Sequence, residues 1–360
     1  MPTAPPREYP AISVVIPMYN TEKYIGFCLE SLLAQTFQNF EVIVVDVCST
    51  DNSCAVVESC IPKFGGRIKL SRLEKNTGGP GIPSNKGISL SRGKYVYVMD
   101  NDDLLTNYAL EIFYKFAEDY NADVVSTDRM FDFIINTEKN FPDNSDVVIK
   151  SQNSPIDKPT LVTNNLEERI NQYFKDEFGR PAWKRLIKRD LLMENDITFP
   201  NLKSSADMVF TLKLIFFSKR FLRIPQPLYI HRKNMNSIVQ SKRTPKNQLK
   251  FWTDVNISGL KAIDEFLSTQ KFILDNPNYR WVILDFFNSI HFNFIISSIS
   301  ALTQPETFEI LKRLFTEKFG ENGNLIEYLC NSSNFLRLRL MAASQYIAQL
   351  EGQIKELNAK

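Results

Sequence analysis

The sequence of 360 residues is poor in the side chains on which several kinds of functional site depend. It has two histidines, His231 and His291, which excludes a multi-histidine zinc site and most histidine-centred triads. Its five cysteines form no CxxC pair and are odd in number, as expected of small apolar side chains in a reducing compartment. The net charge of +2 is too small to indicate nucleic-acid binding, so we expect no nucleic-acid partner.

Long apolar runs and the common nucleotide-binding fingerprints are also missing. The most apolar stretch, 281–299, is interrupted by polar side chains between Asp285 and Asn293, and the first ten residues contain no apolar segment typical of a signal peptide. Neither GxGxxG nor GxxxxGK[ST] occurs, so a dinucleotide fingerprint and a P-loop lack support. We therefore expect a cytoplasmic protein without a membrane span, whose Phe-rich helices are compatible with peripheral contact at the inner face of a membrane.

What the sequence does contain is an alternation of short apolar runs with amphipathic segments between residues 11 and 130. The apolar runs predict strands over 12–17, 40–45, 68–73, 94–99 and 123–127. The amphipathic segments predict helices over 21–36, 53–63, 81–91 and 104–120. This order is typical of βαβ units and predicts an α/β fold with a mainly parallel sheet, in which ligands bind beyond the carboxyl ends of the strands.

The rest of the chain is less regular. Residues 131–165 are rich in Asn, Asp and Pro and predict an irregular, lid-like excursion, whereas residues 166–240 predict short helices. The basic residues between Lys184 and Arg189 predict a solvated helix face. From residue 241 onward the pattern is helical and ends in an apolar stripe over 340–357, which fits either core packing or a dimerising coiled coil.

Three carboxylates, Asp100, Asp102 and Asp103, directly follow the predicted strand 94–99. Crowded carboxylates repel one another, and Mg²⁺ and Mn²⁺ prefer oxygen ligands, often one or two carboxylates with a substrate's phosphates completing the shell. The alternative is a solvated turn that caps the next helix, since Asp is common at turns and N-caps. Both interpretations stay open on this segment alone.

Two further polar segments follow predicted strands. Asp46 can accept hydrogen bonds from a uracil N–H or a ribose hydroxyl, whereas Asp51 is better explained as a cap of the next helix. The segment 76–87 is dense in glycine directly before a helix, where the backbone can approach a ligand and the helix N-terminus favours a diphosphate. A plain turn is the alternative for this segment.

Taken together, these segments resemble the family 2 glycosyltransferases, which have the GT-A fold. The resemblance is specific over about residues 11–130, through the segments Val14–Asn20, Val44–Asp51, Asn76–Gly87 and Met99–Asp103. It continues more weakly to about residue 240, through Trp183–Arg189, Ala206–Phe210 and Tyr229–Arg232. It implies a GT-A domain over 1–240, with a nucleotide-sugar-binding half at 11–130 and an acceptor half at 131–240, followed by a helical C-terminal extension at 241–360.

The resemblance implies a set of residues that hold the nucleotide sugar. Pro17, Tyr19 and Glu22 match the loop that lies against the nucleotide base, and Asp46 matches the carboxylate that contacts uridine. The other positions implied to contact the nucleotide sugar are Asn76, Gly79, Asn85 and Asn101.

The resemblance also implies the reacting groups. Asp100 and Asp102 match the outer positions of the family's DxD motif, which hold the ribose and the metal-bound diphosphate, with Mn²⁺ or Mg²⁺ as the cofactor at Asp102. Asp207 matches the general base of inverting members. His231 and Arg232 fall where basic residues often approach the diphosphate.

The implied activity is an inverting, metal-dependent hexosyl transfer from a UDP-sugar to a hydroxyl of a glycan or lipid-linked acceptor, in the synthesis of polysaccharides or glycoconjugates. A carboxylate base would take the acceptor's proton, and a divalent ion would stabilise the departing nucleoside diphosphate. The C-terminal helices are compatible with a homo-oligomer.

Three positions depart from the family pattern and keep other functions open. Val47 and Ala206 stand where the family usually has acidic residues, and Ser84 stands where it usually has an arginine. These departures favour, as an alternative, a non-catalytic nucleotide-sugar-binding or scaffolding subunit. A sugar-phosphate nucleotidyltransferase uses a similar sheet but needs an Arg/Lys-containing glycine-rich loop near the first strand, where this chain has Pro17–Asn20.

Overall fold

The computed structural model describes residues 9–134, 147–151, 153–233 and 243–320 of the chain. The chain divides into two compact units, residues 1–241 with 261–280 and residues 242–260 with 281–360, and each is described by itself. The apolar stripe predicted over 340–357 lies outside the described residues.

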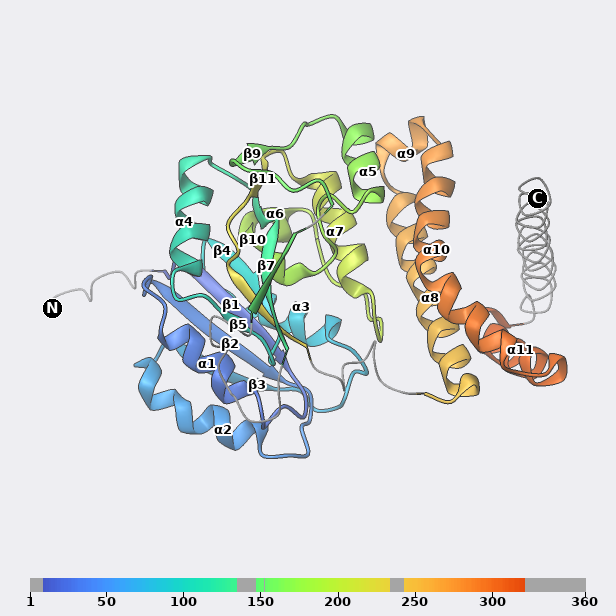
Figure 1. Cartoon of the computed structure of the whole chain (residues 1–360), viewed down its shortest axis with the longest axis horizontal. Helices are drawn as coiled ribbons and strands as arrows, with labels where there is room; N and C mark the ends of the chain where they lie inside the picture. Colours follow the sequence, from blue (N-terminus) through green and yellow to red (C-terminus); the bar gives the residue numbers. More distant parts are fainter. Residues whose placement is uncertain (1–8, 135–146, 152, 234–242, 321–360) are drawn as a thin grey trace, which may run out of the picture. The chain divides into compact units, whose positions relative to one another are not determined.

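The first unit is built around a main sheet of eight described strands (Figure 1). In spatial order the strands are β3 (Ile68–Arg72), β2 (Phe40–Asp46), β1 (Ile12–Met18), β4 (Tyr95–Val98), β10 (Arg185–Lys188), β6 (Val124–Thr127), β11 (Phe221–Ile224) and β9 (Thr160–Leu161). The pairs among β1 to β4 are parallel, whereas β10 runs antiparallel to both of its neighbours. The mainly parallel sheet predicted from the sequence is thus confirmed, and β1 and β2 are buried along their whole length, as central parallel strands are.

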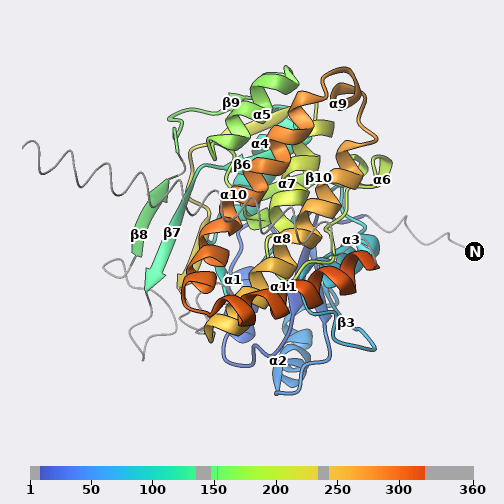
Figure 2. The same ribbon diagram turned by 90° about the vertical axis from the view of Figure 1, so that its right-hand side faces the viewer.

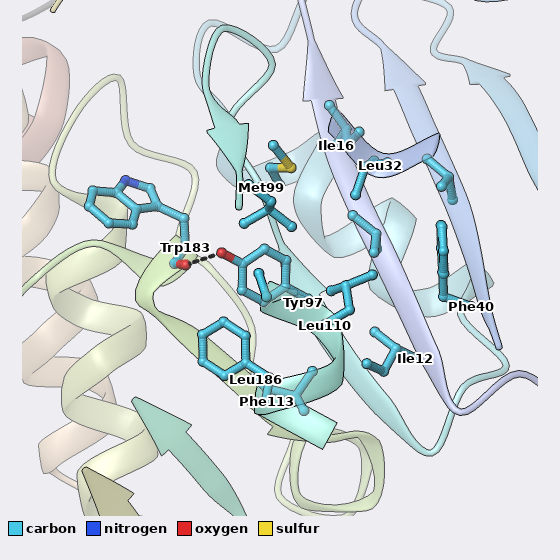
Figure 3. Close-up of a cluster of buried hydrophobic side chains, with 14 of the residues drawn as sticks. Ile12, Ile16, Leu32, Phe40, Tyr97, Met99, Leu110, Phe113, Trp183 and Leu186 are labelled. Atoms are coloured by element: carbon cyan, nitrogen blue, oxygen red, sulfur yellow. Dashed lines mark hydrogen bonds between the residues drawn. The ribbon is translucent and has the colours of Figure 1, made fainter. Parts of the chain in front are cut away.

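Helices cover both faces of this sheet. The helices of the unit before residue 241 are α1 (Ile25–Leu33), α2 (Ser53–Cys60), α3 (Gly81–Leu90), α4 (Ala109–Asp119), α5 (Leu166–Phe174), α6 (Arg189–Glu194) and α7 (Ala206–Phe217), with short 3₁₀ turns η1 (Ile61–Phe64) and η2 (Ala182–Lys184). On one face, Ile12 and Ile16 of β1 join a buried cluster with Leu32 of α1 and Phe113 of α4 (Figure 3). On the other face α3 packs closely on β1, because a Cβ at Gly87 would stand 2.2 Å from Val15 Cγ1.

A smaller sheet joins strands that are far apart in the sequence. Its order is β5 (Leu104–Leu105), β12 (Tyr229–Lys233), β7 (Arg129–Ile134) and β8 (Val147–Ser151). Strand β12 is parallel to β7, and β7 is antiparallel to β8, which lies beside it (Figure 2). Residues 131–165 are therefore not simply irregular, because parts of this segment form β7, β8 and β9.

The helix predicted over 104–120 begins later than expected. Leu104 and Leu105 pair with Ile230 and Tyr229 of β12, and Thr106 N–H donates to the Leu228 carbonyl at 3.0 Å. Because these residues extend along β12, α4 begins only at Ala109. The alternative that the Asp100–Asp103 turn caps a helix starting at Leu104 is therefore wrong.

The solvated helix face predicted at 184–189 is also wrong, since β10 is an interior strand of the main sheet. Arg185 is fully buried, and its guanidinium donates to the carbonyls of Pro181 (2.7 Å) and Phe178 (2.7 Å). Lys184 is 6% exposed. The basic residue types alone do not indicate that the Arg185 guanidinium donates hydrogen bonds to backbone carbonyls in the interior.

The described residues from 243 to 320 are mainly helical, as predicted, through α8 (Pro245–Leu267), α9 (Lys271–Asp275), α10 (Asn278–Ser300) and α11 (Gln304–Phe319). In the second unit, Trp252 stacks on Phe294 with ring centroids 4.3 Å apart, and His291 is buried beside Trp252. By length and composition α10 could cross a membrane, properties that it shares with core helices of soluble proteins. The expected absence of a membrane span stays a prediction.

Candidate active site

A cavity of about 190 Å³ opens beyond the carboxyl ends of β1 and β4, beside the first turn of α7. This is the edge of a parallel sheet where ligands are expected. The side chains and backbone that line it belong to Pro17, Pro80, Ser84, Val98, Asp100, Ala182, Trp183, Phe199, Lys203, Ser204, Ser205, Ala206 and Asp207. Asp100 and Asp207, which are 107 positions apart in the sequence, thus meet in one cavity. We call Asp100, Asp207 and their surroundings the carboxylate cavity.

Asp207 lies in the first turn of α7 but does not cap that helix. Its Oδ2 accepts a hydrogen bond from the backbone N–H of Ala182 at 3.1 Å, and the N-cap position is Ser205, a non-glycine residue with a left-handed φ of +64°. Burial raises the pKa of Asp207, while the Ala182 hydrogen bond and the charge of Arg185 oppose that rise. A buried carboxyl with a raised pKa is a stronger base than an exposed one.

Asp100 has no hydrogen-bond donor among the described residues. Burial raises the pKa of its carboxyl well above the ordinary value, and the negative charges of Asp207 and Asp102 raise it further. The cavity therefore crowds carboxylates, although Lys203 is among its lining residues, and additional positive charge from a ligand would favour the ionised form of Asp100.

Asp103 belongs to the same turn but faces the interior. It is 1% exposed and accepts hydrogen bonds from the Tyr229 hydroxyl at 2.6 Å and the Arg232 backbone N–H at 2.7 Å. Burial and the charges of Asp102 and Asp100 raise its pKa, and these two hydrogen bonds oppose the rise. We call Asp103, Tyr229 and Arg232 the carboxylate anchor.

The side chain of Arg232 also belongs to the anchor. Its Nε donates to the backbone carbonyl of Asp102 at 2.9 Å, and its guanidinium lies over the rings of Tyr24, Phe27 and Phe133 at 5.4 to 5.7 Å. Burial lowers the pKa of Arg232. These contacts of Arg232 hold the backbone at Asp102 in place, and the diphosphate contact that the resemblance implies for Arg232 stays a prediction.

The turn offers carboxylate oxygens that suit a hard divalent cation. Within the described residues, no group of three or more His, Cys, Asp or Glu side chains is arranged to hold a metal ion by itself. With Asp103 committed to the anchor, Asp100 lines the cavity, and Asp102 is close enough for its charge to raise the pKa of Asp100. One or two carboxylates completed by a substrate's phosphates is the usual way in which proteins hold Mg²⁺, so the donor set fits such an ion.

The loops that follow β1 and β2 hold each other in place. Glu22 N–H donates to Asp51 at 3.0 Å, and Glu22 Oε2 accepts from Asn52 N–H at 2.9 Å. Asn101 Nδ2 donates to the carbonyl of Pro17 at 2.7 Å, which ties the turn after β4 to the end of β1. Tyr19, at the end of β1, is 47% exposed. Glu22 and Asn101 therefore shape the predicted base-binding loop through contacts within the protein.

The glycine-rich segment approaches protein backbone rather than open space at two of its glycines. A Cβ at Gly79 would stand 2.1 Å from the carbonyl oxygen of Leu202, and one at Gly81 would stand 2.4 Å from that of Pro200. Gly78, with φ of +78°, has nothing within 4 Å. The Asn85 amide pairs with both backbone groups of Phe199, at 2.8 and 2.9 Å. Asn76 Oδ1 accepts from Gly78 N–H at 2.8 Å. Within this structure the segment docks against residues 199–202, one of which lines the cavity.

The remaining predicted residues lie near, but outside, the residues lining the cavity. Asp46 is 3% exposed and both of its carboxylate oxygens lie 3.3 Å from Ser49 N–H. His231 contacts Asp132 through Nδ1 at 3.0 Å, and its ring lies parallel to that of Trp183 with centroids 6.0 Å apart.

The sequence patterns missed part of the site. Trp183 and Phe199 both line the cavity, and the Trp183 ring stacks on Tyr229 with centroids 3.9 Å apart. Phe199 follows no strand of the predicted alternating region, so no local pattern marked it, whereas Trp183 belongs to a segment that carries the family resemblance. The pairing of β12 with β5, which brings Tyr229 to this place, joins segments more than 120 positions apart.

Comparison with known proteins identifies relatives of a single kind. The family model described as glycosyl transferase family 2 matches residues 13–195. The glycosyltransferase GlyG of Streptococcus pneumoniae is 30% identical over 241 residues, which cover 64% of this chain and 73% of that protein. The poly(ribitol-phosphate) β-N-acetylglucosaminyltransferase TarS of Staphylococcus aureus is 30% identical over 222 residues, 61% of this chain but only 35% of TarS.

A solved structure extends the likeness in three dimensions. The crystal structure of S. aureus TarS residues 1–349 in complex with UDP-GlcNAc has a TM-score of 0.60 and 26% sequence identity, covering 85% of this chain and 80% of that one. The likeness therefore reaches well beyond the region matched by the family model.

Proposed function

The chain belongs to glycosyl transferase family 2 and has the GT-A fold, and from this premise we propose that it transfers a sugar from a UDP-sugar to a hydroxyl acceptor with inversion at the anomeric carbon. The observation that carries the proposal is the meeting of Asp100 and Asp207 in one cavity at the carboxyl edge of the sheet. Inverting transfer needs a base on one side of the sugar and a held leaving group on the other, and this cavity supplies candidates for both.

Asp207 is the proposed base. Its raised pKa suits proton abstraction from the acceptor hydroxyl as that oxygen attacks the anomeric carbon. The hydrogen bond from Ala182 holds one carboxylate oxygen in place, which leaves Oδ1 for the acceptor. A single displacement then inverts the anomeric centre, with the proton on Asp207 and the negative charge on the departing UDP.

Asp100 and Asp102 are the proposed holders of the donor's ribose and diphosphate. A divalent cation bound at Asp102 would stabilise the departing diphosphate as a Lewis acid. Arg232 fixes the Asp102 backbone, and we propose His231 as a contact to the donor. The proposed uridine site is formed by Asp46 together with Pro17, Tyr19 and Glu22. The resemblance implies that Asn76, Gly79 and Asn85 also contact the nucleotide sugar.

We assign transfer to residues 1–240, with residues 131–240 as the acceptor half, and propose that residues 241–360 contribute to the choice of acceptor or to assembly. Because relatives such as TarS modify poly(ribitol-phosphate), a polyol-phosphate polymer belongs among the acceptors to be tried, beside lipid-linked glycans. We place the reaction in the cytoplasm, at or near the inner face of the membrane.

The test is UDP release by the purified full chain, with a panel of UDP-sugars, Mn²⁺ or Mg²⁺, and these acceptors. We expect acceptor-stimulated UDP release that stops when EDTA removes the metal. In Asp102→Asn, metal-dependent UDP binding should weaken by more than roughly tenfold, the loss caused by disturbing even an outer partner of a metal ligand.

The matched control is Asp119→Asn, at an exposed carboxylate on α4 that pairs with Lys115. It should bind UDP like the unaltered chain. Tight metal-dependent UDP binding without turnover on any acceptor would favour the non-catalytic, nucleotide-sugar-binding alternative. Unchanged binding in Asp102→Asn would remove that residue from the metal site.

A further inference from the structure

The smaller sheet contains a buried carboxylate to which neither the family pattern nor the cavity assigns a role. Asp132 on β7 has a side chain that is 2% exposed, and it is the register partner of His231 on β12. Its Oδ1 lies 3.0 Å from His231 Nδ1, and its Oδ2 lies 2.6 Å from Lys150 Nζ and 3.4 Å from Lys233 Nζ. Three basic side chains from β8 and β12 thus converge on one carboxylate.

The charge state of Asp132 determines which His231 nitrogen carries a proton. Burial acts to raise the pKa of Asp132, but hydrogen bonds from Lys150 and His231 outweigh burial and the pKa lies below its ordinary value. The carboxylate is therefore ionised at neutral pH and can only accept hydrogen bonds. His231 Nδ1 must then be the donor, and Nε2 is the ring nitrogen left for another partner.

The ring held in this way adjoins the carboxylate cavity through a stack of aromatic side chains. The His231 ring is inclined by 12° to the ring of Trp183, which in turn is inclined by 8° to Tyr229. Trp183 lines the cavity with Asp100 and Asp207. The side chain of His231 is 37% exposed, so part of the ring is accessible.

We propose that Asp132 is a positioning residue that fixes His231 in the Nδ1–H form and orientation, so that Nε2 is presented to the sugar nucleotide. Asp132 touches no substrate in this scheme and acts through His231 alone. Lys150 and Lys233 balance its charge. The proposal rests on the proposed function for the substrate it names, whereas the hydrogen-bond arrangement can be tested without turnover.

The first experiment is NMR on the full chain labelled with ¹⁵N-histidine, which gives signals from two rings only. His291 is an internal reference, because its Nδ1 lies 3.0 Å from the Phe287 carbonyl, which can only accept. We expect the Nδ1–H pattern for both rings, and a change at His231 alone in Asp132→Asn. An Nε2–H pattern at His231 in the unaltered chain, or an unchanged His231 signal in Asp132→Asn, would overturn the proposal.

The second experiment measures kcat and KM of UDP-sugar turnover. Asp132→Asn and His231→Ala should each lower kcat/KM by roughly ten- to hundredfold, the effect of one charge-assisted hydrogen bond, and the double variant should lose no more than His231→Ala alone. Fully additive losses would show that Asp132 acts independently of His231. The control is Asp157→Asn, whose exposed carboxylate pairs with Arg129 and should leave turnover unchanged.

A pair of variants at the exposed ring tests the same idea without altering the buried carboxylate. His231→Asn keeps an amide near the Nδ1 position, whereas His231→Gln keeps one near the Nε2 position. We expect His231→Gln to retain more turnover than His231→Asn, and the reverse order would contradict the assignment of Nε2 to the substrate. If the unaltered chain turns over no UDP-sugar, the proposed function fails while the NMR result still decides the Asp132–His231 contact.

Discussion

The carboxylate anchor and the carboxylate cavity share the four-residue turn Asp100–Asp103. The turn places one carboxylate in each, and the surroundings of the two carboxylates are opposite. In the anchor, Asp103 receives hydrogen bonds from Tyr229 and the Arg232 backbone. In the cavity, Asp100 has no donor among the described residues and faces the charges of Asp207 and Asp102. Both carboxyls have raised pKa values, but hydrogen bonds oppose the rise only at Asp103.

The difference separates a structural carboxylate from a functional one. A buried polar group that is fully hydrogen-bonded contributes to a unique fold, whereas a crowded one without partners costs stability. Such a cost persists in a fold when a ligand or a reaction uses the group. The anchor therefore holds the turn in place, so that Asp100 can lie in the cavity without a hydrogen-bond donor among the described residues.

The largest effect should come from Asp207→Asn, which keeps the shape of the cavity but removes the base. The amide can still accept the hydrogen bond from Ala182, yet it cannot take a proton from the acceptor. We expect kcat to fall by roughly 10²- to 10⁴-fold, the usual contribution of general base catalysis. Turnover of the UDP-sugar with acceptor measures this loss, and calorimetry should show UDP affinity nearly unchanged.

Two outcomes separate chemistry from binding in that experiment. A loss of UDP affinity equal to the loss of kcat/KM would move Asp207 to the donor site. Full activity in Asp207→Asn would remove it from catalysis, and the cavity would then need another base.

A smaller effect should come from Tyr229→Phe, which breaks the anchor while keeping the ring that stacks on Trp183. The buried carboxyl of Asp103 would lose one of its two donors, and we expect the free energy of unfolding to fall by about 2 kcal/mol. Urea denaturation measures this change.

The chain offers a matched control for the anchor. Tyr97→Phe removes a buried hydroxyl that donates to the neutral carbonyl of Trp183 at 2.5 Å (Figure 3). Hydrogen bonds to charged groups are stronger than bonds to neutral ones, so Tyr97→Phe should cost about half as much. If Tyr97→Phe lowers the free energy of unfolding more than Tyr229→Phe does, the anchor does not stabilise the turn more than an ordinary buried hydrogen bond would.

The cavity could be predicted from the sequence to the extent that its residues follow strands. Asp100 directly follows an apolar run, and the carboxyl ends of parallel strands lie at one edge of the sheet. The local pattern and the geometry of parallel sheets are therefore enough to predict the position of Asp100. Asp207 came from the family resemblance, since an acidic residue at a helix start otherwise indicates a cap. Its true orientation, toward Ala182, depends on tertiary structure.

The anchor could not be predicted, because it depends on pairing between distant segments. Nothing near Asp103 indicates that Tyr229 and Arg232 will arrive through β12, whose register with β5 sets both hydrogen bonds. The burial of Arg185 was missed for the same reason, since β10 is buried by pairing with the distant strands β4 and β6, although its carbonyl partners Pro181 and Phe178 are close in the sequence. Hydrophobic periodicity carries no information about such polar pairs.

The smallest expected effect, and the one opposite in sign, is a gain in stability from Asp100→Asn. Burial and the neighbouring charges raise the pKa of Asp100 well above its ordinary value of 3.8. Between these two values the folded chain holds a proton that the unfolded chain has released, so stability falls as pH rises through this range. Asp100→Asn does not suffer this fall in stability. We expect its free energy of unfolding at neutral pH to be higher by about 1 kcal/mol, which raises the unfolding temperature by about 2–4 °C.

The pH dependence tests whether charge crowding causes this gain. The advantage of Asp100→Asn should disappear below about pH 3.8, where the carboxyl is neutral in both states, and Asp119→Asn should show no gain at any pH. A divalent cation should stabilise the unaltered chain more than Asp100→Asn, because its charge offsets the crowding of Asp100 by Asp207 and Asp102. If Asp100→Asn instead destabilises the chain at neutral pH, as Tyr229→Phe is expected to, the cavity is as well compensated as the anchor, and the contrast between a structural and a functional carboxylate fails.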